Sequence, residues 1–592
     1  MSGDTATTLP SGPSGVVNRL VQHIDWALLG GILLAVAANF LLAARQNVNW
    51  DEFNYLTQVH SYLRGELVAR MQTFHVHLFG WLPGLSSNEV DQIVGARLVI
   101  GIVAAANALL IYVGARRFMD RHAALFGLCA YLAMNFVIGN SIAFRADPMA
   151  TFLALLACFT VVGKPGRTMG AAIAGAIMAV AMMLTIKSIF YVTAFGLVFL
   201  AMGETWRDRF RLGLAFAAAG IPVFALLYGV HAETLATPPD LVPLAGLGPA
   251  GSKMFLADGL FPRWPEFLAS VAANPILWFA CSIGVATLLG AIRRRPERRE
   301  RRDAWVLLAM TVPVLTPLIY RNAFDYYYVF ILPPAAWLAG IAYQRLFSAA
   351  MTSARGFAAR FLITVVVLQL LFLTAYLARQ WPDRTTPQRL TLAGVHQVFP
   401  ALVAYIDGYG IVASFPSAGF FMSSWGMDSY RAVGRPIFAD RVAAAQPPML
   451  LADALALHDA LLPGLPVPDN LRLLPEDASF LVDHYLQYWG MLFVAGKQLA
   501  VPGGGPLEFT IAVAGDYRLE GAAPVRIDGK SLAPNEVIML SEGVHLVETD
   551  ATDSADVRLV WAVAQPAPSQ APVDILTFFG MTSPGPASEP SP

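Results

Sequence analysis

Long, closely spaced runs of apolar residues constrain the fold of this chain more than any other feature. Each run has about 18 to 22 residues, the length an α-helix needs to cross a hydrocarbon layer of about 30 Å. Hydrophobic residues occupy 56% of the 592 positions and charged residues only 14%. A soluble core could not bury so much apolar surface. The sequence therefore predicts a polytopic α-helical membrane protein.

Eleven of these runs are predicted to span the membrane. They lie near residues 25–44, 92–114, 123–142, 147–163, 169–186, 188–202, 212–230, 273–292, 303–320, 326–347 and 361–379. With a cytoplasmic amino terminus, the arginine-rich segment 293-RRRPERRERR-302 lies inside, in agreement with the positive-inside rule. We interpret this segment as a topology anchor rather than a nucleic-acid patch. The expected location is a bacterial inner (plasma) membrane, with the segments 45–91, 143–146, 231–272 and 321–325 on the periplasmic side.

Changes in composition divide the chain into four regions. We expect a cytoplasmic tail at 1–24, a transmembrane domain at 25–380, a periplasmic soluble domain at 381–565 and a disordered tail at 566–592, which is rich in Pro and Ser. Within the soluble domain, short alternating runs from residue 507 to 550 are separated by Gly-Asp, Asp-Gly and Glu-Gly pairs. This pattern predicts an antiparallel β module in an α/β or mostly β domain.

An acidic pair, Asp51 and Glu52, directly follows the first predicted span. The segment that begins here carries Phe53, Leu56 and Val59 at helical spacing, which predicts an amphipathic helix at the membrane interface. Acidic residues at a helix start favour capping and the helix dipole, so a structural role is one interpretation. The other is that a carboxylate acts as a general base in catalysis.

Further charged and aromatic residues are predicted to reach the same outward face. They are Arg145 and Asp147 before the fourth span, Lys187 between the fifth and sixth, and Arg321 with Tyr326, Tyr327 and Tyr328 before the tenth. Each has a structural alternative: an ion pair in a short loop, a lysine at a helix end, and an interfacial aromatic belt. Charges near hydrocarbon are costly, so their gathering at one membrane surface indicates a polar cavity.

These parts suit the transfer of a sugar from a phospholipid carrier. A carboxylate would remove the proton of the acceptor as it attacks the anomeric carbon, and cations would stabilise the charge on the departing phosphate. One general base without a carboxylate nucleophile implies a single displacement with inversion.

The residues also resemble a family. The Asp51-Glu52 pair, Arg145-x-Asp147, the Leu-Thr-x-Lys segment that ends at Lys187, and Arg321 with the tyrosine run look like the GT-C class of integral membrane glycosyltransferases. The nearest likeness is to the branch that holds protein O-mannosyltransferases and the lipid A aminoarabinose transferase, and it covers roughly residues 24–350. Lys187 is followed by Ser where Gly or Pro is expected.

The resemblance implies a GT-C-like helical bundle with juxtamembrane helices and a polyprenyl-phosphate-linked monosaccharide as donor. It implies that Asp51 is the base, Glu52 its partner in acceptor binding, and Lys187 and Arg321 phosphate ligands. The acceptor is an envelope lipid, polysaccharide or protein. The sequence predicts no cofactor, although Asp51 and Glu52 could hold a divalent cation, as in more distant GT-C enzymes.

Two further features have alternative interpretations. His75 and His77 have a His-x-His spacing that can bind zinc, but without a clear third ligand we interpret them as structural or substrate-binding residues and predict no metal site. For the whole chain, the alternatives to an enzyme are a flippase for a lipid-linked sugar and a non-catalytic scaffold. A transporter predicts internal symmetry and charges at the bilayer midplane, and the sequence has neither.

Overall fold

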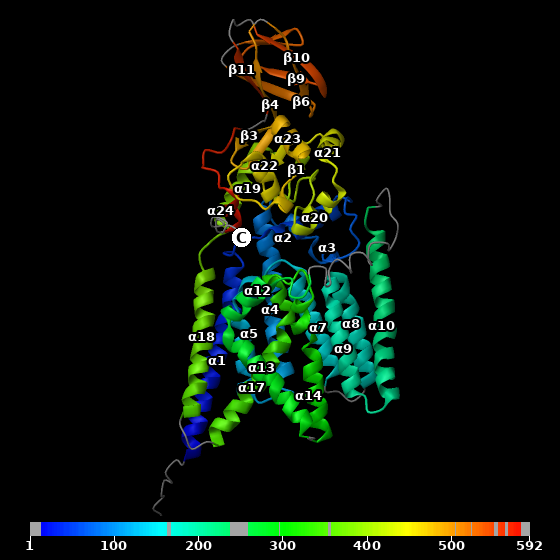
Figure 1. Cartoon of the computed structure of the whole chain (residues 1–592), viewed down its shortest axis with the longest axis vertical. Coiled ribbons are helices and arrows are strands. Elements are labelled where there is room, and N and C mark those ends of the chain that lie inside the picture. Colours follow the sequence, from blue (N-terminus) through cyan, green and yellow to red (C-terminus); the bar gives the residue numbers. More distant parts are fainter. Residues whose placement is uncertain are drawn as a thin grey trace, which may run out of the picture. The chain divides into compact units, whose positions relative to one another are not determined.

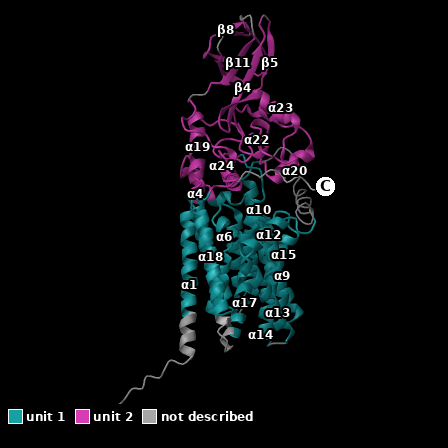
Figure 2. Cartoon of the chain, turned by 60° about the vertical axis from the view of Figure 1, so that its left-hand side comes forward, with its two compact units in different colours: residues 1–46, 66–78, 96–382 teal, residues 47–65, 79–95, 383–592 magenta. Residues whose placement is uncertain are grey.

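The structure is a computed structural model of the chain (Figure 1). It describes residues 13–162, 167–236, 259–294, 297–352, 357–503, 505–521, 524–549, 554–562 and 566–581. Parts of the expected cytoplasmic tail, of the outward segment 231–272 and of the carboxyl-terminal tail lie outside the described residues. The chain forms two compact units (Figure 2): residues 1–46, 66–78 and 96–382, called unit 1, and residues 47–65, 79–95 and 383–592, called unit 2.

Unit 1 is a bundle of helices. Its longer helices are α1 (Pro13–Leu42), α4 (Glu89–Ala115, in unit 1 from Ala96), α5 (Arg121–Leu132), α7 (Ala146–Val161), α8 (Arg167–Leu184), α9 (Ile189–Met202), α10 (Trp206–Glu233), α12 (Trp264–Ala273), α13 (Pro275–Arg293), α14 (Arg298–Met310), α17 (Pro333–Thr352) and α18 (Phe357–Gln380). Short helical pieces are α3 (Val76–Phe79), α6 (Asn135–Asn140), η2 (Ile186–Ser188), α15 (Val312–Leu315), η3 (Thr316–Leu318), η4 (Asp325–Tyr327) and α16 (Tyr328–Ile331).

In the described part of the chain, six helices are long and apolar enough to cross a membrane. They are Gln22–Leu42, Glu89–Ala115, Arg167–Leu184, Trp206–Glu233, Pro275–Arg293 and Arg360–Gln380. The predicted span 303–320 is interrupted where proline occurs. The run 303–320 is divided into α14, α15 and η3 at Pro313 and Pro317, because proline lacks the amide hydrogen that a continuous helix needs. The total of eleven spans stays a prediction.

Small residues allow two of these helices to pack closely. A side chain added at Gly175 of α8 would collide with the Phe216 carbonyl of α10, and one added at Gly220 of α10 would reach the Gly175 carbonyl at 2.9 Å. Such backbone-to-backbone approach replaces the hydrophobic effect as the source of helix association in lipid. The three cysteines, Cys129, Cys158 and Cys281, are buried and free.

Unit 2 combines one juxtamembrane helix with a carboxyl-terminal α/β region. Its helices are α2 (Trp50–Leu63), the first turns of α4, α19 (Thr386–Val398), α20 (Ser424–Val433), α21 (Phe438–Ala445), α22 (Leu455–Leu461), α23 (Pro475–His484) and α24 (Ile575–Phe579), with η1 (Leu82–Gly84) and η5 (Asp469–Leu471). Its strands are β1 (Tyr405–Ile406), β2 (Met449–Leu451), β3 (Tyr485–Trp489), β4 (Leu492–Val501), β5 (Leu507–Ile511), β6 (Gly515–Glu520), β7 (Val525–Ile527), β8 (Lys530–Leu532), β9 (Val537–Leu540), β10 (Gly543–Thr549) and β11 (Ala555–Trp561).

The strands form two sheets. One has the order β1-β2-β4-β11-β6-β9, with β3 also paired to β4, and the other has the order β5-β10-β7-β8. All pairs in the predicted β module are antiparallel, which confirms that expectation. The β7–β8 hairpin turns at Asp528 and Gly529, whose φ angles of 49° and 80° suit the Asp-Gly pair.

The expected disordered tail needs a correction. Residues 566–581 are described and contain α24, with Asp574 capping its start and Gly580 ending it at a φ of 61°. Phe578 and Phe579 of this helix are buried. The expectation of disorder was therefore wrong for residues 566–581, while residues 582–592 lie outside the described part.

Candidate active site

The acidic pair lies at the start of α2 in unit 2, as the sequence predicts. Asn49 caps this helix: its side chain accepts a hydrogen bond from the Glu52 amide at 3.1 Å, and the Glu52 carboxylate accepts one from the Asn49 amide at 3.2 Å. Glu52 is fully buried, whereas Asp51 is half-buried. The capping alternative thus applies to Glu52, and Asp51 is the member of the pair outside this reciprocal cap.

Aromatic residues from the far end of the chain cover the apolar face of α2. Trp50 stacks on Tyr409 with ring centroids 5.5 Å apart, and Phe579 meets the edge of Trp50 at 5.7 Å. Phe53 stacks on Phe578 at 5.9 Å. The predicted apolar positions Phe53, Leu56 and Val59 are fully buried, so protein covers this face of the helix.

A loop of residues 408–411 contacts the same helix at Thr57. The Thr57 hydroxyl donates to the Gly410 carbonyl at 2.9 Å. The loop itself is held by the buried carboxylate of Asp453, which accepts the amides of Gly408 at 2.7 Å and Tyr409 at 3.1 Å. Burial raises the pKa of Asp453, and the charge of nearby Asp407 raises it further. The loop that contacts α2 is therefore held by a buried carboxylate whose pKa is raised.

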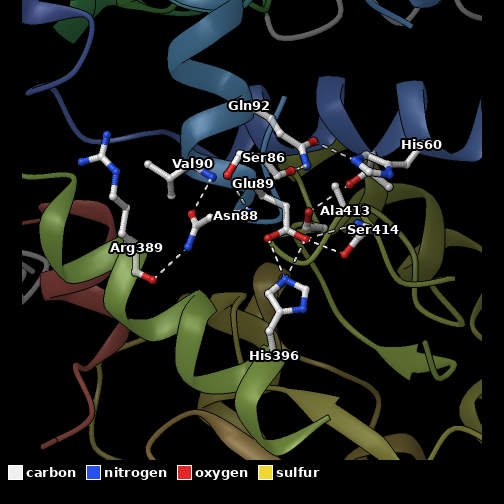
Figure 3. A network of polar contacts seen from close by, with 12 residues as sticks. His60, Ser86, Asn88, Glu89, Val90, Gln92, Arg389, His396, Ala413 and Ser414 are labelled. Carbon is white, nitrogen blue, oxygen red and sulfur yellow. Dashed lines mark hydrogen bonds and ion pairs between the residues drawn. The ribbon is translucent and has the colours of Figure 1, made fainter. Parts of the chain in front are cut away.

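A second buried carboxylate, Glu89, ties the first turn of α4 to α19 and to the chain around residue 414 (Figure 3). The Glu89 oxygens lie 3.0 and 3.2 Å from Nε2 of His396, and Oε1 accepts the Ser414 hydroxyl at 2.6 Å. Burial lowers the pKa of His396, but the hydrogen bond and charge of Glu89 outweigh this effect, and the pKa is raised.

Neighbouring polar contacts continue this network (Figure 3). Nε of Arg389 in α19 donates to the Asp91 carboxylate at 2.7 Å. The Arg389 carbonyl accepts a hydrogen bond from the Asn88 side chain at 3.1 Å. Gln92 lies 2.8 Å from His60 of α2. The sequence analysis missed Glu89 and His396, which are 307 residues apart in the chain. The available signal was that Glu89 is an acidic residue at the start of an apolar run.

Unit 1 brings three of the predicted residues together around one buried carboxylate. Asp147, near the start of α7, is 2% exposed; its Oδ1 lies 2.7 Å from the Lys187 ammonium, and its Oδ2 lies 3.5 Å from Nε of Arg145. Arg145 is also buried. Two cations therefore contact the same carboxylate.

Tyr326 covers these cations. The Arg145 guanidinium lies 3.6 Å from the centroid of the Tyr326 ring, and the Lys187 ammonium lies 4.7 Å from it. Both distances are in the range of cation–π attraction. The carboxylate and the ring thus hold both cations in place.

The other tyrosines and Arg321 have different environments. Tyr327 is buried, and its hydroxyl lies 2.6 Å from that of Thr316; Tyr328 is also buried, against Phe136. These two contribute to packing, and Tyr327 also lies 5.7 Å from the Lys187 ammonium. Arg321 is half-buried, and its carbonyl accepts a hydrogen bond from Nε of Arg263 at 3.0 Å. Its role as a phosphate ligand stays a prediction.

His75 and His77 have separate surroundings. His75 is buried, and its ring packs edge-to-face with that of Phe144, with centroids 6.0 Å apart. Nε2 of His77 lies 2.8 Å from Nδ1 of His231, whose Nε2 lies 2.9 Å from the Thr73 hydroxyl. Among the described residues, no group of three or more His, Cys, Asp or Glu side chains is placed to hold a metal ion.

The fold defined by unit 1 and unit 2 is that of an integral membrane protein of the GT-C-like class, with a helical bundle and a carboxyl-terminal strand-rich region. Solved structures with this fold include the oligosaccharyltransferase of Archaeoglobus fulgidus in its apo form, with a TM-score of 0.52, 11% identity, and coverage of 92% of this chain and 98% of that one. The same archaeal enzyme, AglB, in complex with an inhibitory peptide and a dolichol-phosphate, matches with a TM-score of 0.50 and 11% identity over 91% and 97% of the two chains.

A third similar structure is ArnT from Cupriavidus metallidurans bound to undecaprenyl phosphate. Its TM-score is 0.49, with 16% identity over 76% of this chain and 97% of that one. No protein-family model matches the sequence, and no curated protein matches it. The likeness to the two archaeal structures defines the fold class, which agrees with the expectation drawn from the sequence.

Proposed function

We propose that this chain is an inverting glycosyltransferase that moves a monosaccharide from a polyprenyl-phosphate donor to an acceptor of the bacterial cell envelope, on the periplasmic face of the inner membrane. The observation that carries the proposal is the cluster of Arg145 and Lys187 around Asp147 under the Tyr326 ring. The acceptor is a lipid, a polysaccharide or a protein. The orientation rests on the arginine-rich segments.

The charges of this cluster support a phosphate-binding role. A buried arginine and a part-buried lysine lie together on one carboxylate, and both are side chains that bind phosphate, the anion that the donor carries. Arginine binds phosphate oxygens in a planar, bidentate manner, whereas lysine provides a point charge. An archaeal protein with the same fold was solved with a dolichol-phosphate, which is a lipid of this chemical class.

In the proposed reaction, an acceptor hydroxyl or amine attacks the anomeric carbon of the sugar. Asp51 takes the acceptor proton as the new bond forms. The bond between the anomeric carbon and the phosphate oxygen breaks, and Arg145 and Lys187, with Arg321 as a further candidate, stabilise the polyprenyl phosphate that leaves. Because the sugar is transferred in a single displacement, its anomeric configuration inverts.

Glu52 has a supporting role in this proposal. Its carboxylate is engaged in the cap of α2, so it fixes the helix that presents Asp51. The step needs no cofactor, because Asp51 provides the base and the cationic cluster provides the charge stabilisation. His75, beside Phe144, is proposed to support Arg145.

The test compares envelope glycans and lipid-linked sugars from cells that carry the wild-type chain, Asp51→Asn, Lys187→Gln or Glu52→Gln. Mass spectrometry of these extracts should show loss of one glycan and accumulation of its lipid-linked donor for Asp51→Asn and Lys187→Gln. Immunoblots would establish equal protein levels. Unchanged glycans in both of these variants at wild-type protein levels would overturn the assignment.

A further inference from the structure

A cavity in unit 1 lies where four helices end, away from the cluster at Asp147. It has a volume of about 1070 Å³ and is lined by the last turns of α9, the end of α13, the link into α10 with Arg209 of that helix, and one face of α14. Lys187 precedes α9, whereas Met202 at the other end of α9 lines the cavity. The 14 residues of α9 rise by about 21 Å, so the two sites are at opposite ends of one helix.

Arginine dominates the polar part of this cavity. The lining contains six arginines and one carboxylate, Glu204, and the arginines are Arg209, Arg293, Arg298, Arg299, Arg301 and Arg302. Glu204 lies 3.6 Å from Arg298, and Asp303 lies 3.2 Å from Arg302. Arg298 is 72% exposed, so its ion pair with Glu204 is weak and solvated. The lining therefore keeps a large excess of positive charge.

The other wall of the cavity is apolar and partly uncovered. Leu197 and Leu200 of α9 are 42% and 44% exposed, and Trp305 of α14 is 47% exposed. Along α14 the arginines occupy the first turns, and Trp305 and Leu308 follow one to two turns deeper. The lining thus changes from cationic to apolar over the length of a few helical turns.

We propose that this cavity binds an anionic phospholipid, with the phosphate among the arginines and an acyl chain along Leu197, Leu200 and Trp305. Such a gradient from cationic to apolar matches a lipid, whose phosphate and hydrocarbon are joined in the same order. A soluble anion would use only the arginines and leave the apolar wall exposed. All six cations are arginine, the side chain that binds phosphate oxygens in pairs.

The amino terminus of α14 adds to the attraction for a phosphate. Its N-cap, Glu297, makes no side-chain hydrogen bond to the helix, and the positive end of the helix dipole points toward the arginine-lined end of the cavity. The inference is independent of the proposed transfer reaction, because no residue of this lining belongs to the cluster at Asp147 or to α2.

The test is lipid binding by the purified full-length protein in detergent. Native mass spectrometry would count dioleoyl-phosphatidylglycerol and dioleoyl-phosphatidylcholine retained by the wild type and by the triple variant Arg298→Gln/Arg299→Gln/Arg301→Gln. We expect the wild type to retain phosphatidylglycerol selectively and the variant to bind it about 100-fold more weakly, because each arginine near an anionic headgroup contributes about a factor of five.

A charge-matched control separates this site from general attraction. The variant Arg207→Gln/Arg211→Gln/Arg345→Gln removes three exposed arginines outside the lining and should bind phosphatidylglycerol like the wild type. A second variant, Leu200→Asp, keeps every arginine and should also lose the lipid. It tests the apolar wall if the triple variant fails to fold.

Three outcomes would overturn the proposal. Equal retention of phosphatidylglycerol and phosphatidylcholine would show that the headgroup is not recognised. Equal loss in the lining variant and its charge-matched control would show that only net charge matters. Displacement of phosphatidylglycerol by inorganic phosphate at equal concentration, with no effect of Leu200→Asp, would show a soluble-anion site instead.

Discussion

The Lys187 ammonium lies 2.7 Å from the Asp147 carboxylate, although 40 residues separate the two along the chain. Both side chains are almost completely withdrawn from solvent, with side-chain exposures of 11% and 2%. Removing one partner of a buried ion pair leaves an uncompensated charge and typically costs about 3 to 5 kcal/mol. This pair therefore connects the stability of unit 1 with the proposed binding of the donor phosphate.

We expect Asp147→Asn to destabilise the protein by about 3 kcal/mol, because Arg145 and Lys187 lose their shared counter-ion. Thermal unfolding in detergent would measure the shift. The double variant Asp147→Asn/Lys187→Met serves as the control, since it removes one cation with the anion and should recover part of the loss. A double variant less stable than Asp147→Asn alone would contradict this account.

Asp51 and Glu52 should respond differently to isosteric substitution. Asp51→Asn should abolish sugar transfer and leave the melting temperature near that of the wild type. Glu52→Gln should retain activity while lowering stability by about 1 kcal/mol, because the charged partner of the capping box is weakened. Transfer assays and unfolding curves on the same preparations would distinguish the two. Full activity in Asp51→Asn would reject Asp51 as the base.

The Tyr326 ring is expected to matter through its face rather than its hydroxyl. Tyr326→Phe keeps the ring over Arg145 and Lys187 and should preserve affinity for the lipid-linked donor. Tyr326→Leu removes the cation–π contacts and should weaken donor binding by about 1 to 2 kcal/mol, roughly 5- to 30-fold. Competition with purified polyprenyl phosphate would measure the affinity. Equal losses in both variants would indicate that the hydroxyl is the important group.

The Glu89–His396 pair predicts a pH dependence of stability. Glu89 raises the pKa of His396 above its value in the unfolded chain, which is about 6.5. The folded state then binds the proton more tightly. The stabilisation is fully present below about pH 6.5 and is lost as the pH rises through the folded-state pKa.

Unfolding curves of the wild type and His396→Gln, taken from about pH 5.5 to 8.5, check this sign. The difference in unfolding free energy between the two proteins should shrink as the pH rises. The difference between the wild type and Glu89→Gln should shrink in the same way. A difference that stays constant across the range would show that the contact is a neutral hydrogen bond.

Substitution of Asp453 is expected to affect α2 through the loop 408–411. Asp453→Ala leaves the buried amides of Gly408 and Tyr409 without their acceptor, which costs about 1 to 3 kcal/mol. The loop then no longer supports Thr57 and Trp50. Hydrogen exchange of α2 amides should accelerate while that of α13 is unchanged, and equal acceleration in both helices would point to general unfolding.

Local sequence patterns predicted several parts of this structure, because the forces involved act over short stretches. The spacing of Phe53, Leu56 and Val59 indicated the buried face of α2, and the Asp528-Gly529 pair indicated a hairpin turn. The family resemblance brought Arg145, Asp147 and Lys187 into one hypothesis. Arg145 and Asp147 are two residues apart in the sequence, but the contact of Asp147 with Lys187 depends on how the helices pack.

Other parts depended on contacts between distant segments. Composition favoured disorder after residue 565, yet Asp574 and Gly580 provide the two ends of α24, and its two phenylalanines pack on Phe53 and Trp50. No local pattern reveals that Glu89 would meet His396. Prolines 313 and 317 were visible in the sequence, but the length of the apolar run outweighed them in the prediction of one span.

Unit 2 is assembled from residues 47–65, 79–95 and 383–592, and this arrangement determines when the packing around α2 is completed during synthesis. The ribosome makes α2 early, but the residues that bury Phe53 and Trp50 are the aromatic pair near position 579. More than five hundred residues must be translated between the two. A nascent chain, or one truncated by a late stop codon, would thus carry Asp51 on a helix without the cover of α24, and the proposed transfer would await the synthesis of α24.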